Sequence, residues 1–195
     1  MKKFYPMRAA DSIFGTRPLS YREQQLRKEI SDWAITKFGT DDRFLFAMTA
    51  TCKRAIKGPL GNLIWLTAET LENELKVFFR RIDWQLFKNA SKRHGKCIER
   101  FCTIEGGGYT GKRIHVHALV LGPPVQQMHP TRFIRALKSH WVSSPWGRRD
   151  VLFDLPASPL AAARYITKTG LDAVAWSSTE LDSVRANRLP VANNK

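Results

Sequence analysis

Two histidines separated by one residue are the most chemically suggestive feature of this 195-residue chain. His115 and His117 lie in a run of branched apolar residues at 113–121, which predicts a buried strand. Side chains two apart on a strand share a face, about 7 Å apart along it. Two imidazoles so placed can hold one metal ion. A hydrogen-bonded pair of core histidines, or a place on an edge strand, would also explain them.

Glu105 is the candidate third ligand. Residues 97–105 predict a strand, and the Gly-Gly-Gly-Tyr-Thr-Gly segment at 106–111 predicts the turn of an antiparallel hairpin. If Glu105 pairs with His115, its side chain faces the same way as both histidines, whereas a slip of one residue turns it away. Two imidazoles and one carboxylate suit Mg²⁺ or Mn²⁺ acting as a Lewis acid on a phosphate, with Zn²⁺ also open. An ordinary carboxylate at a hairpin end is the plainer interpretation.

Tyr165 and Lys168 form a second candidate group. Ser158 and Pro159 predict the start of a helix and Gly170 its end, and residues three apart on a helix share a face. A tyrosine hydroxyl has a pKa near 10, and a neighbouring cation favours the nucleophilic phenolate. A half-buried tyrosine beside a surface lysine is the commoner meaning of such a pair. Its interest here is that it follows the histidine strand on a separate helix.

The charge of the chain indicates a polyanionic partner. The formal net charge is +15, which is typical of proteins that bind nucleic acid, without distinguishing DNA from RNA or from an anionic membrane. Residues 106–149 contain no Asp or Glu. The basic residues of this stretch predict a phosphate-binding cleft, although a solvated basic surface would look the same. They are Lys112, Arg113, Arg132, Arg135, Lys138, Arg148 and Arg149.

Other features exclude several classes of protein. The three cysteines include no Cys-x-x-Cys motif, which argues against a disulfide framework or a structural zinc site and favours reduced thiols in the cytoplasm. The apolar runs are too short to span a membrane, so no membrane partner is expected. The N-terminus lacks the apolar core of a signal peptide.

Periodicity and turn residues predict an α+β domain. Helices are expected at residues 21–38, 69–87, 131–141 and 158–169, and strands at 43–52, 63–66, 97–105, 113–121 and 150–155. This order favours an antiparallel sheet covered by helices on one face, with an extra N-terminal helix. We expect residues 1–20 to form a basic arm, residues 21–176 the domain, and residues 177–195 a loosely ordered tail.

The order of three motifs resembles that of the HUH endonucleases. These are the apolar strand Phe-Leu-Phe-Ala-Met-Thr-Ala-Thr at residues 44–51, then His-Val-His at 115–117, then Tyr-Ile-Thr-Lys at 165–168. The resemblance covers residues 43–170, and its middle motif is the specific one. Within the group the chain is most similar to single-tyrosine rolling-circle replication initiators (Rep proteins) of plasmids and single-stranded DNA viruses or phages.

The resemblance implies a ferredoxin- or RRM-like sheet with His115, His117 and Glu105 as ligands of Mg²⁺ or Mn²⁺. It implies Tyr165 as the nucleophile and Lys168 as its partner, cutting single-stranded DNA at a replication origin. Many Rep proteins continue with a phosphate-binding Gly-x-x-x-x-Gly-Lys-Ser/Thr loop, which this chain lacks, so a separate helicase and host replication proteins are expected as partners.

Three other functions remain open. A single-tyrosine HUH transposase or mobilisation relaxase would share the motifs. A non-catalytic RRM-like nucleic-acid-binding domain would use aromatic residues such as Phe101 or Tyr109 to stack on bases. A metal-dependent hydrolase would cut without a covalent step.

Overall fold

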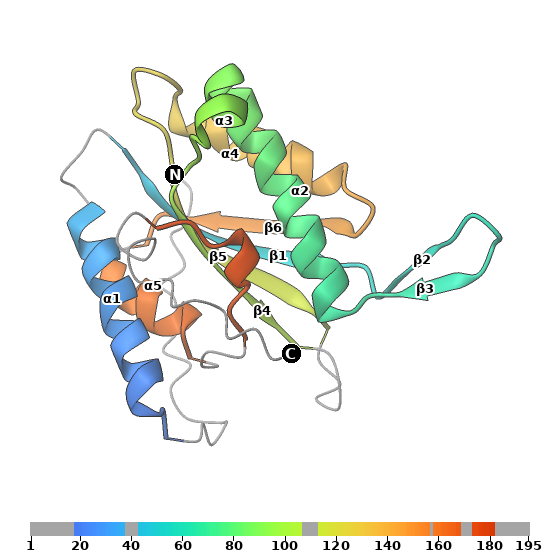
Figure 1. Ribbon diagram of the computed structural model, residues 1–195, viewed down its shortest axis with the longest axis horizontal. Helices are drawn as coiled ribbons and strands as arrows, with labels where there is room; N and C mark the ends of the chain where they lie inside the picture. The colour runs from blue at the N-terminus through green and yellow to red at the C-terminus, as the bar shows by residue number, and fades with distance from the viewer. Residues whose placement is uncertain (1–17, 38–42, 107–112, 157, 169–172, 182–195) are drawn as a thin grey trace, which may run out of the picture.

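The structure is a computed structural model that describes residues 18–37, 43–106, 113–156, 158–168 and 173–181. Figure 1 shows the arrangement of its elements. The helices are α1 (Tyr21–Lys37), α2 (Ala68–Phe87), α3 (Asn89–His94), α4 (Pro130–Val142) and α5 (Pro159–Ile166), with a 3₁₀ turn at Trp176–Ser178. The strands are β1 (Leu45–Cys52), β2 (Ala55–Lys57), β3 (Leu63–Trp65), β4 (Arg100–Glu105), β5 (His115–Leu121) and β6 (Gly147–Asp154).

Four strands form one antiparallel sheet in the order β4-β5-β1-β6. Helix α2 connects β1 to β4 with β5 between them, and α4 connects β5 to β6 with β1 between them. This is the β-α-β-β-α-β arrangement of ferredoxin-like folds. The predicted fold class, α+β with a ferredoxin/RRM-like antiparallel sheet, helical cover and an added N-terminal helix, is therefore confirmed.

The helices begin where capping residues predict. Ser20 and Glu23 form a reciprocal capping box at α1, in which Ser20 N donates to Glu23 Oε2 at 2.8 Å. Thr67 caps α2 through a hydrogen bond from Thr70 N, and Ser158 caps α5 through one from Ala161 N. Among the described residues, no helix is long and apolar enough to cross a bilayer.

Helices cover both faces of the sheet, so the expectation of helices on one face is wrong. On one face, alternate sheet residues such as Val116 and Ala118 pack with α2 and α4 around Phe78 and Trp141. On the other face, Leu119 and neighbouring sheet residues pack with α1 and α5. Amphipathic patterns show that a helix buries one side, but not which side of a sheet receives it. The face covered by α1 and α5 is the one that carries the histidines, because side chains alternate along β5.

Two further parts of the chain differ from expectation. Residues 177–181 were expected in a loosely ordered tail, yet Ser178 is buried and Glu180 pairs with Arg100 along the outer edge of β4. Strand β6 begins at Gly147 instead of 150, because an edge strand with an irregular register accommodates the half-buried Arg148 and the exposed Arg149. The remainder of the predicted arm and tail, residues 1–17 and 182–195, lies outside the described residues.

Candidate active site

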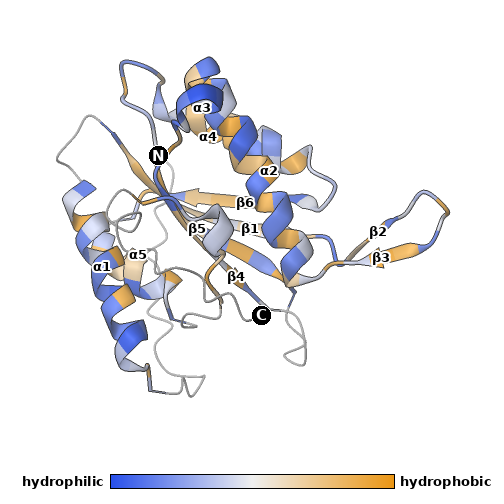
Figure 2. Cartoon of the chain, viewed as in Figure 1, coloured by the Kyte–Doolittle hydropathy of each residue, from blue (hydrophilic) through white to orange (hydrophobic). Residues whose placement is uncertain are grey.

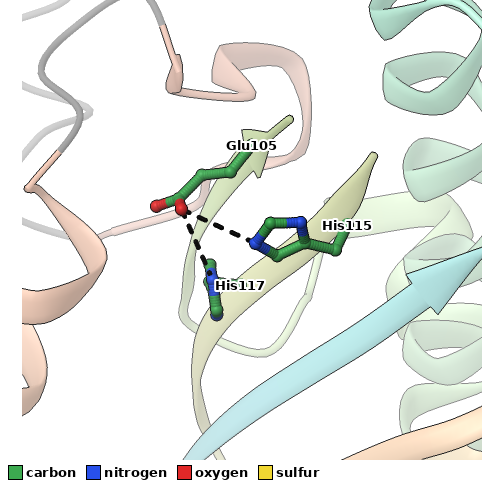
Figure 3. A group of neighbouring side chains, drawn as sticks. All are labelled: Glu105, His115 and His117. Carbon is green, nitrogen blue, oxygen red and sulfur yellow. Dashed lines mark ion pairs between the residues drawn. The ribbon is translucent and has the colours of Figure 1, made fainter. Parts of the chain in front are cut away.

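The strand register brings three potential metal ligands together (Figure 3). Glu105 at the end of β4 is the direct partner of His115 at the start of β5, as predicted. The Nε2 atoms of His115 and His117 each lie 3.6 Å from Glu105 Oε2. One ligand atom from each residue lies within 4.8 Å of the others. The predicted cluster of two imidazoles and a carboxylate therefore exists, and it can hold a metal ion.

The far ring nitrogens of both histidines are held by the sheet. His115 Nδ1 donates to the backbone carbonyl of Arg113 at 2.9 Å, which leaves Nε2 with the lone pair that binds a metal. His117 Nδ1 lies 3.0 Å from Thr49 Oγ1 on β1. Thr49 is the register partner of His117. These two contacts orient both Nε2 atoms towards Glu105.

The distances and burial in this cluster fit a cation better than direct hydrogen bonds. A separation of 3.6 Å is too long for a good hydrogen bond. It is close to the roughly 3–3.5 Å expected between two atoms bound to one ion at about 2.0–2.2 Å. His117 is 4% exposed, and its Nε2 has no hydrogen-bond partner among the described residues. A buried imidazole nitrogen that makes no hydrogen bond is costly unless something binds it.

Tyr165 and Lys168 lie beside the cluster. The Tyr165 ring makes an edge contact with the His117 ring at a centroid distance of 5.1 Å. Lys168 Nζ lies 3.8 Å from the centre of the Tyr165 ring and 3.0 Å from Glu105 Oε2. Tyr165 is 39% exposed, so its ring also faces solvent. The tyrosine and lysine predicted as a pair are thus in contact with each other and with two of the three candidate ligands.

The charges of the cluster depend on one another. Burial alone would raise the pKa of Glu105, but polar contacts with His115, His117 and Lys168 outweigh it and hold that pKa well below its usual range. Contact with Glu105 raises the pKa of His115 despite the opposing effect of burial. Glu105 is therefore an ionised carboxylate at neutral pH, as a ligand for a divalent cation must be.

Helix α1 fixes the end of α5 that carries Tyr165. Arg27 on α1 donates to Thr167 Oγ1 and to the Thr167 carbonyl, each at 3.2 Å. Helix α5 ends at Ile166, three residues earlier than predicted, with Thr167 as its C-cap. Lys168 continues in a turn whose backbone N–H donates to Tyr165 O at 3.3 Å. The early end of the helix allows the lysine to fold back over the tyrosine ring.

Most of the predicted DNA-binding residues lie away from this cluster. Arg135, Lys138 and Arg149 line a surface hollow between α4 and β6. Arg132 is exposed on the same helix, α4. Because α4 covers the sheet face opposite the histidines, these residues cannot contact a phosphate held at the cluster. They remain candidates for DNA that passes around the domain.

Two other predicted DNA-binding residues have different surroundings. Arg148 forms an exposed ion pair with Asp150 at 3.6 Å. Arg113 is the basic residue of the predicted set that adjoins the cluster, through its carbonyl contact with His115. Lys112 lies outside the described residues.

Sequence reasoning missed three residues that support the site. Thr49 contacts His117 and Arg27 contacts Thr167, each from an element distant in sequence, so only the sheet order and the helix packing bring these pairs together. Thr103 is the register partner of His117 on β4, is fully buried, and leaves its hydroxyl without a hydrogen-bond partner among the described residues. The alternation of side chains along the predicted hairpin could have identified Thr103, because it places residues 103, 105, 115 and 117 on one face.

The structure also tests one role weighed for a binding module. Phe101 was considered as a base-stacking residue, but it is fully buried between the sheet and the helices α1 and α5. A ring in that position cannot stack on a nucleic acid, so this assignment is wrong. Tyr109, the other aromatic residue considered, lies outside the described residues.

Comparisons of the chain with protein-family models, with curated proteins and with solved structures find no match.

Proposed function

We propose that this protein is a metal-dependent endonuclease and strand transferase of the HUH type. It would nick and rejoin single-stranded DNA at a specific site through a covalent 5′-phosphotyrosine intermediate, and so initiate rolling-circle replication. The observation that carries the proposal is the contact of a tyrosine ring with a buried metal-ligand cluster, 5.1 Å between the ring centres of Tyr165 and His117. The fold and the ion pair between Lys168 and Glu105 agree with this assignment.

Glu105, His115 and His117 would hold the cation. Their mixed oxygen and nitrogen donor set suits Mg²⁺ or Mn²⁺. Such an ion supplies Lewis-acid polarisation of a phosphodiester. The buried position of His117 and Glu105, 4% and 7% exposed, excludes bulk water from one side of the site. A phosphate must then approach from the solvent side, where Tyr165 is exposed.

Tyr165 would be the nucleophile. Its phenolic oxygen loses a proton to solvent and forms a bond to the phosphorus, and the bond from phosphorus to the 3′ oxygen breaks. The leaving oxygen takes up a proton and becomes a free 3′-OH, while the DNA stays attached to Tyr165 through its 5′ phosphate. One phosphodiester replaces another, so a 3′-OH can reverse the reaction and rejoin the strand.

Lys168 would assist both parts of the site. Its ammonium group lies over the Tyr165 ring, where a cation can stabilise the negative charge that develops when the tyrosine attacks a phosphate. The same group contacts Glu105, and it can exchange that contact for a phosphate oxygen when DNA and a cation are present. Lys168 thereby links the charge of the ligand cluster to the reactivity of the tyrosine.

The proposed partners follow from the same activity. A net charge of +15 suits binding to a DNA backbone, and single-stranded DNA at a replication origin would be the substrate. Unwinding would depend on a separate helicase, and host replication proteins would extend the 3′-OH. The cytoplasm of a bacterium or other host cell is the proposed location.

A covalent-adduct assay tests the proposal. The wild-type protein is incubated with Mn²⁺ and single-stranded oligonucleotides that carry a randomised segment, and adducts stable to a denaturing gel are counted. We expect adducts with the wild type, none with Tyr165→Phe, His117→Ala or added EDTA, and a normal amount with Tyr21→Phe. Tyr21 is a suitable control because it is 77% exposed at the start of α1.

Other outcomes would favour the competing functions. Cleavage that persists in Tyr165→Phe would indicate a metal-dependent hydrolase without a covalent step. Tight binding with neither cleavage nor adduct would favour a non-catalytic binding domain. An adduct that forms only on transposon-end or transfer-origin sequences would identify a transposase or relaxase instead of a replication initiator.

A further inference from the structure

A short hairpin projects from the body of the domain. Strands β2 and β3 pair with each other and not with the main sheet, and they extend away from it in Figure 1. Two residues separate the end of β1 from the start of the hairpin. Its base is fixed, because Leu66 is buried in the α2 and α4 core and its N–H donates to Arg54 O at 2.8 Å. The part beyond the base stands in solvent.

One face of this hairpin exposes large apolar side chains. The register places Ala55 opposite Trp65 and Lys57 opposite Leu63, so these four residues share a face. Trp65 is 65% exposed, Leu63 is 58% exposed, and Leu60 at the tip is 94% exposed. Figure 2 shows β3 as a hydrophobic strand on this projection. An exposed indole grouped with aliphatic side chains is typical of a binding surface.

The charge around the hairpin complements nucleic acid. The chain has no Asp or Glu from residue 43 to residue 68, and Lys53, Arg54 and Lys57 lie within the hairpin or at its base. The exposed face offers Lys57 but no Arg, Asn or Gln to read base edges in a groove. An aromatic ring beside a cation instead suits stacking on an unpaired base with a contact to its phosphate.

The hairpin leaves the sheet at the end that carries the candidate active site. Thr51, next to last in β1, is the register partner of His115. A single DNA strand that crosses the ligand cluster towards the end of β1 therefore continues towards β2 and β3. The path of the DNA across the cluster rests on the proposed function. Along that path, the exposed face of the hairpin lies next to the substrate.

From these observations we infer that Trp65, Leu63 and Lys57 form a stacking platform for unpaired bases of single-stranded DNA beside the scissile phosphate. Trp65 stacks on a base, Leu63 extends the apolar contact, and Lys57 neutralises a backbone phosphate. The platform contributes affinity that tolerates many sequences, because every base has an aromatic face.

Binding to a labelled dT20 strand in EDTA, measured by fluorescence anisotropy, tests the platform without cleavage. Trp65→Ala should weaken binding by about fivefold to a hundredfold, and Trp65→Phe should keep most of the affinity. Trp84→Ala is the matched control, because Trp84 is 55% exposed on α2 outside the hairpin. Lys57→Ala should reduce the salt dependence by about 0.7 log units of affinity per log unit of salt. The affinity for a 20-base-pair duplex should change much less in Trp65→Ala.

An unchanged affinity for dT20 in Trp65→Ala would overturn the platform, as would an equal loss for the duplex. Self-association that Trp65→Ala abolishes, with no change in DNA binding, would assign the surface to a second copy and equally overturn it. The proposed function fails separately. If binding depends on Trp65 but no adduct forms, the stacking platform stands and the proposed enzyme activity fails. If adducts form but binding does not depend on Trp65, the enzyme activity stands and the platform fails.

Discussion

Removing Lys168 should tighten metal binding while it impairs the reaction. In the structure Lys168 Nζ lies 3.0 Å from Glu105 Oε2, an oxygen that is also 3.6 Å from both histidine Nε2 atoms. A cation entering the cluster must displace this ammonium group from the carboxylate. Lys168→Met abolishes that competition, so the metal no longer has to break an ion pair.

The size of the effect follows from the burial of the pair. Ion pairs in solvent contribute about 0.2–1 kcal/mol and hydrogen bonds to charged groups about 1.5–3 kcal/mol. Lys168 is 35% exposed and Glu105 only 7%, which places this pair between the two cases, at about 1–2 kcal/mol. Lys168→Met should therefore increase Mn²⁺ affinity by about 5- to 30-fold. Adduct formation should fall, because the cation over the Tyr165 ring is lost.

Calorimetric titration with Mn²⁺ measures the affinity, and the adduct assay measures the reaction. Lys37→Met is the matched control, since Lys37 Nζ lies 3.0 Å from Glu99 Oε1, which is not one of the candidate ligands. Its metal affinity should equal that of the wild type. Weaker Mn²⁺ binding in Lys168→Met would refute the reasoning, because Lys168 would then organise Glu105 for the metal instead of competing with it.

Three further predictions follow from other parts of the structure. Contact with Glu105 raises the pKa of His115, and a proton must leave the imidazole before a metal binds, so Mn²⁺ affinity should keep rising above about pH 6.5. A Mn²⁺ affinity that does not change with pH in this range would contradict the prediction. Asp83→Ala leaves the buried Arg100 without its carboxylate at 3.0 Å and should lower the free energy of unfolding in urea by about 3–5 kcal/mol; a loss below about 1 kcal/mol would refute it. Burial raises the pKa of Cys52 and of Cys102 to about 12, so a disulfide reagent should label only Cys97 in the native protein. Rapid labelling of all three thiols would contradict the burial of Cys52 and Cys102.

The ligand cluster could be predicted because its information is local. Residues 105 and 115 flank one glycine-containing turn, so a single assumption about register placed Glu105 beside His115 and fixed the face of His117. The apolar pattern of β5 could not fix that register, because helices cover both faces of the sheet and β5 is buried on each of them.

The supporting contacts could not be predicted because they join distant segments. Thr49 reaches His117 only because β1 lies beside β5 in the sheet, and Arg27 reaches Thr167 only because α1 packs on α5. The order of strands in a sheet is a property of the whole fold, not of any window of sequence. The same limit explains why the sequence could not show that the basic residues of α4 lie on the side of the sheet opposite the histidines.

The projecting hairpin shows a different limit. Residues 63–66 were expected as a short strand, but the partner strand at Ala55–Lys57 was not recognised, since three residues are too few to show a period. Trp65 and Leu63 also look like core residues in the sequence, although both are more than half exposed. In a sequence, exposed apolar residues cannot be told from core residues, and only the exposure of their side chains in the structure separates the two.

Mapping the covalent adduct by mass spectrometry shows directly whether Tyr165 is the nucleophile. The wild-type protein is allowed to react with Mn²⁺ and the oligonucleotide pool, digested with trypsin and nuclease, and searched for nucleotide-bearing peptides. We expect the modification on the peptide that follows Arg164 and reads Tyr-Ile-Thr-Lys, residues 165–168. A nucleotide on one of the other three tyrosines, Tyr5, Tyr21 or Tyr109, would contradict the site, and no modified peptide from any strand or metal would contradict the enzyme.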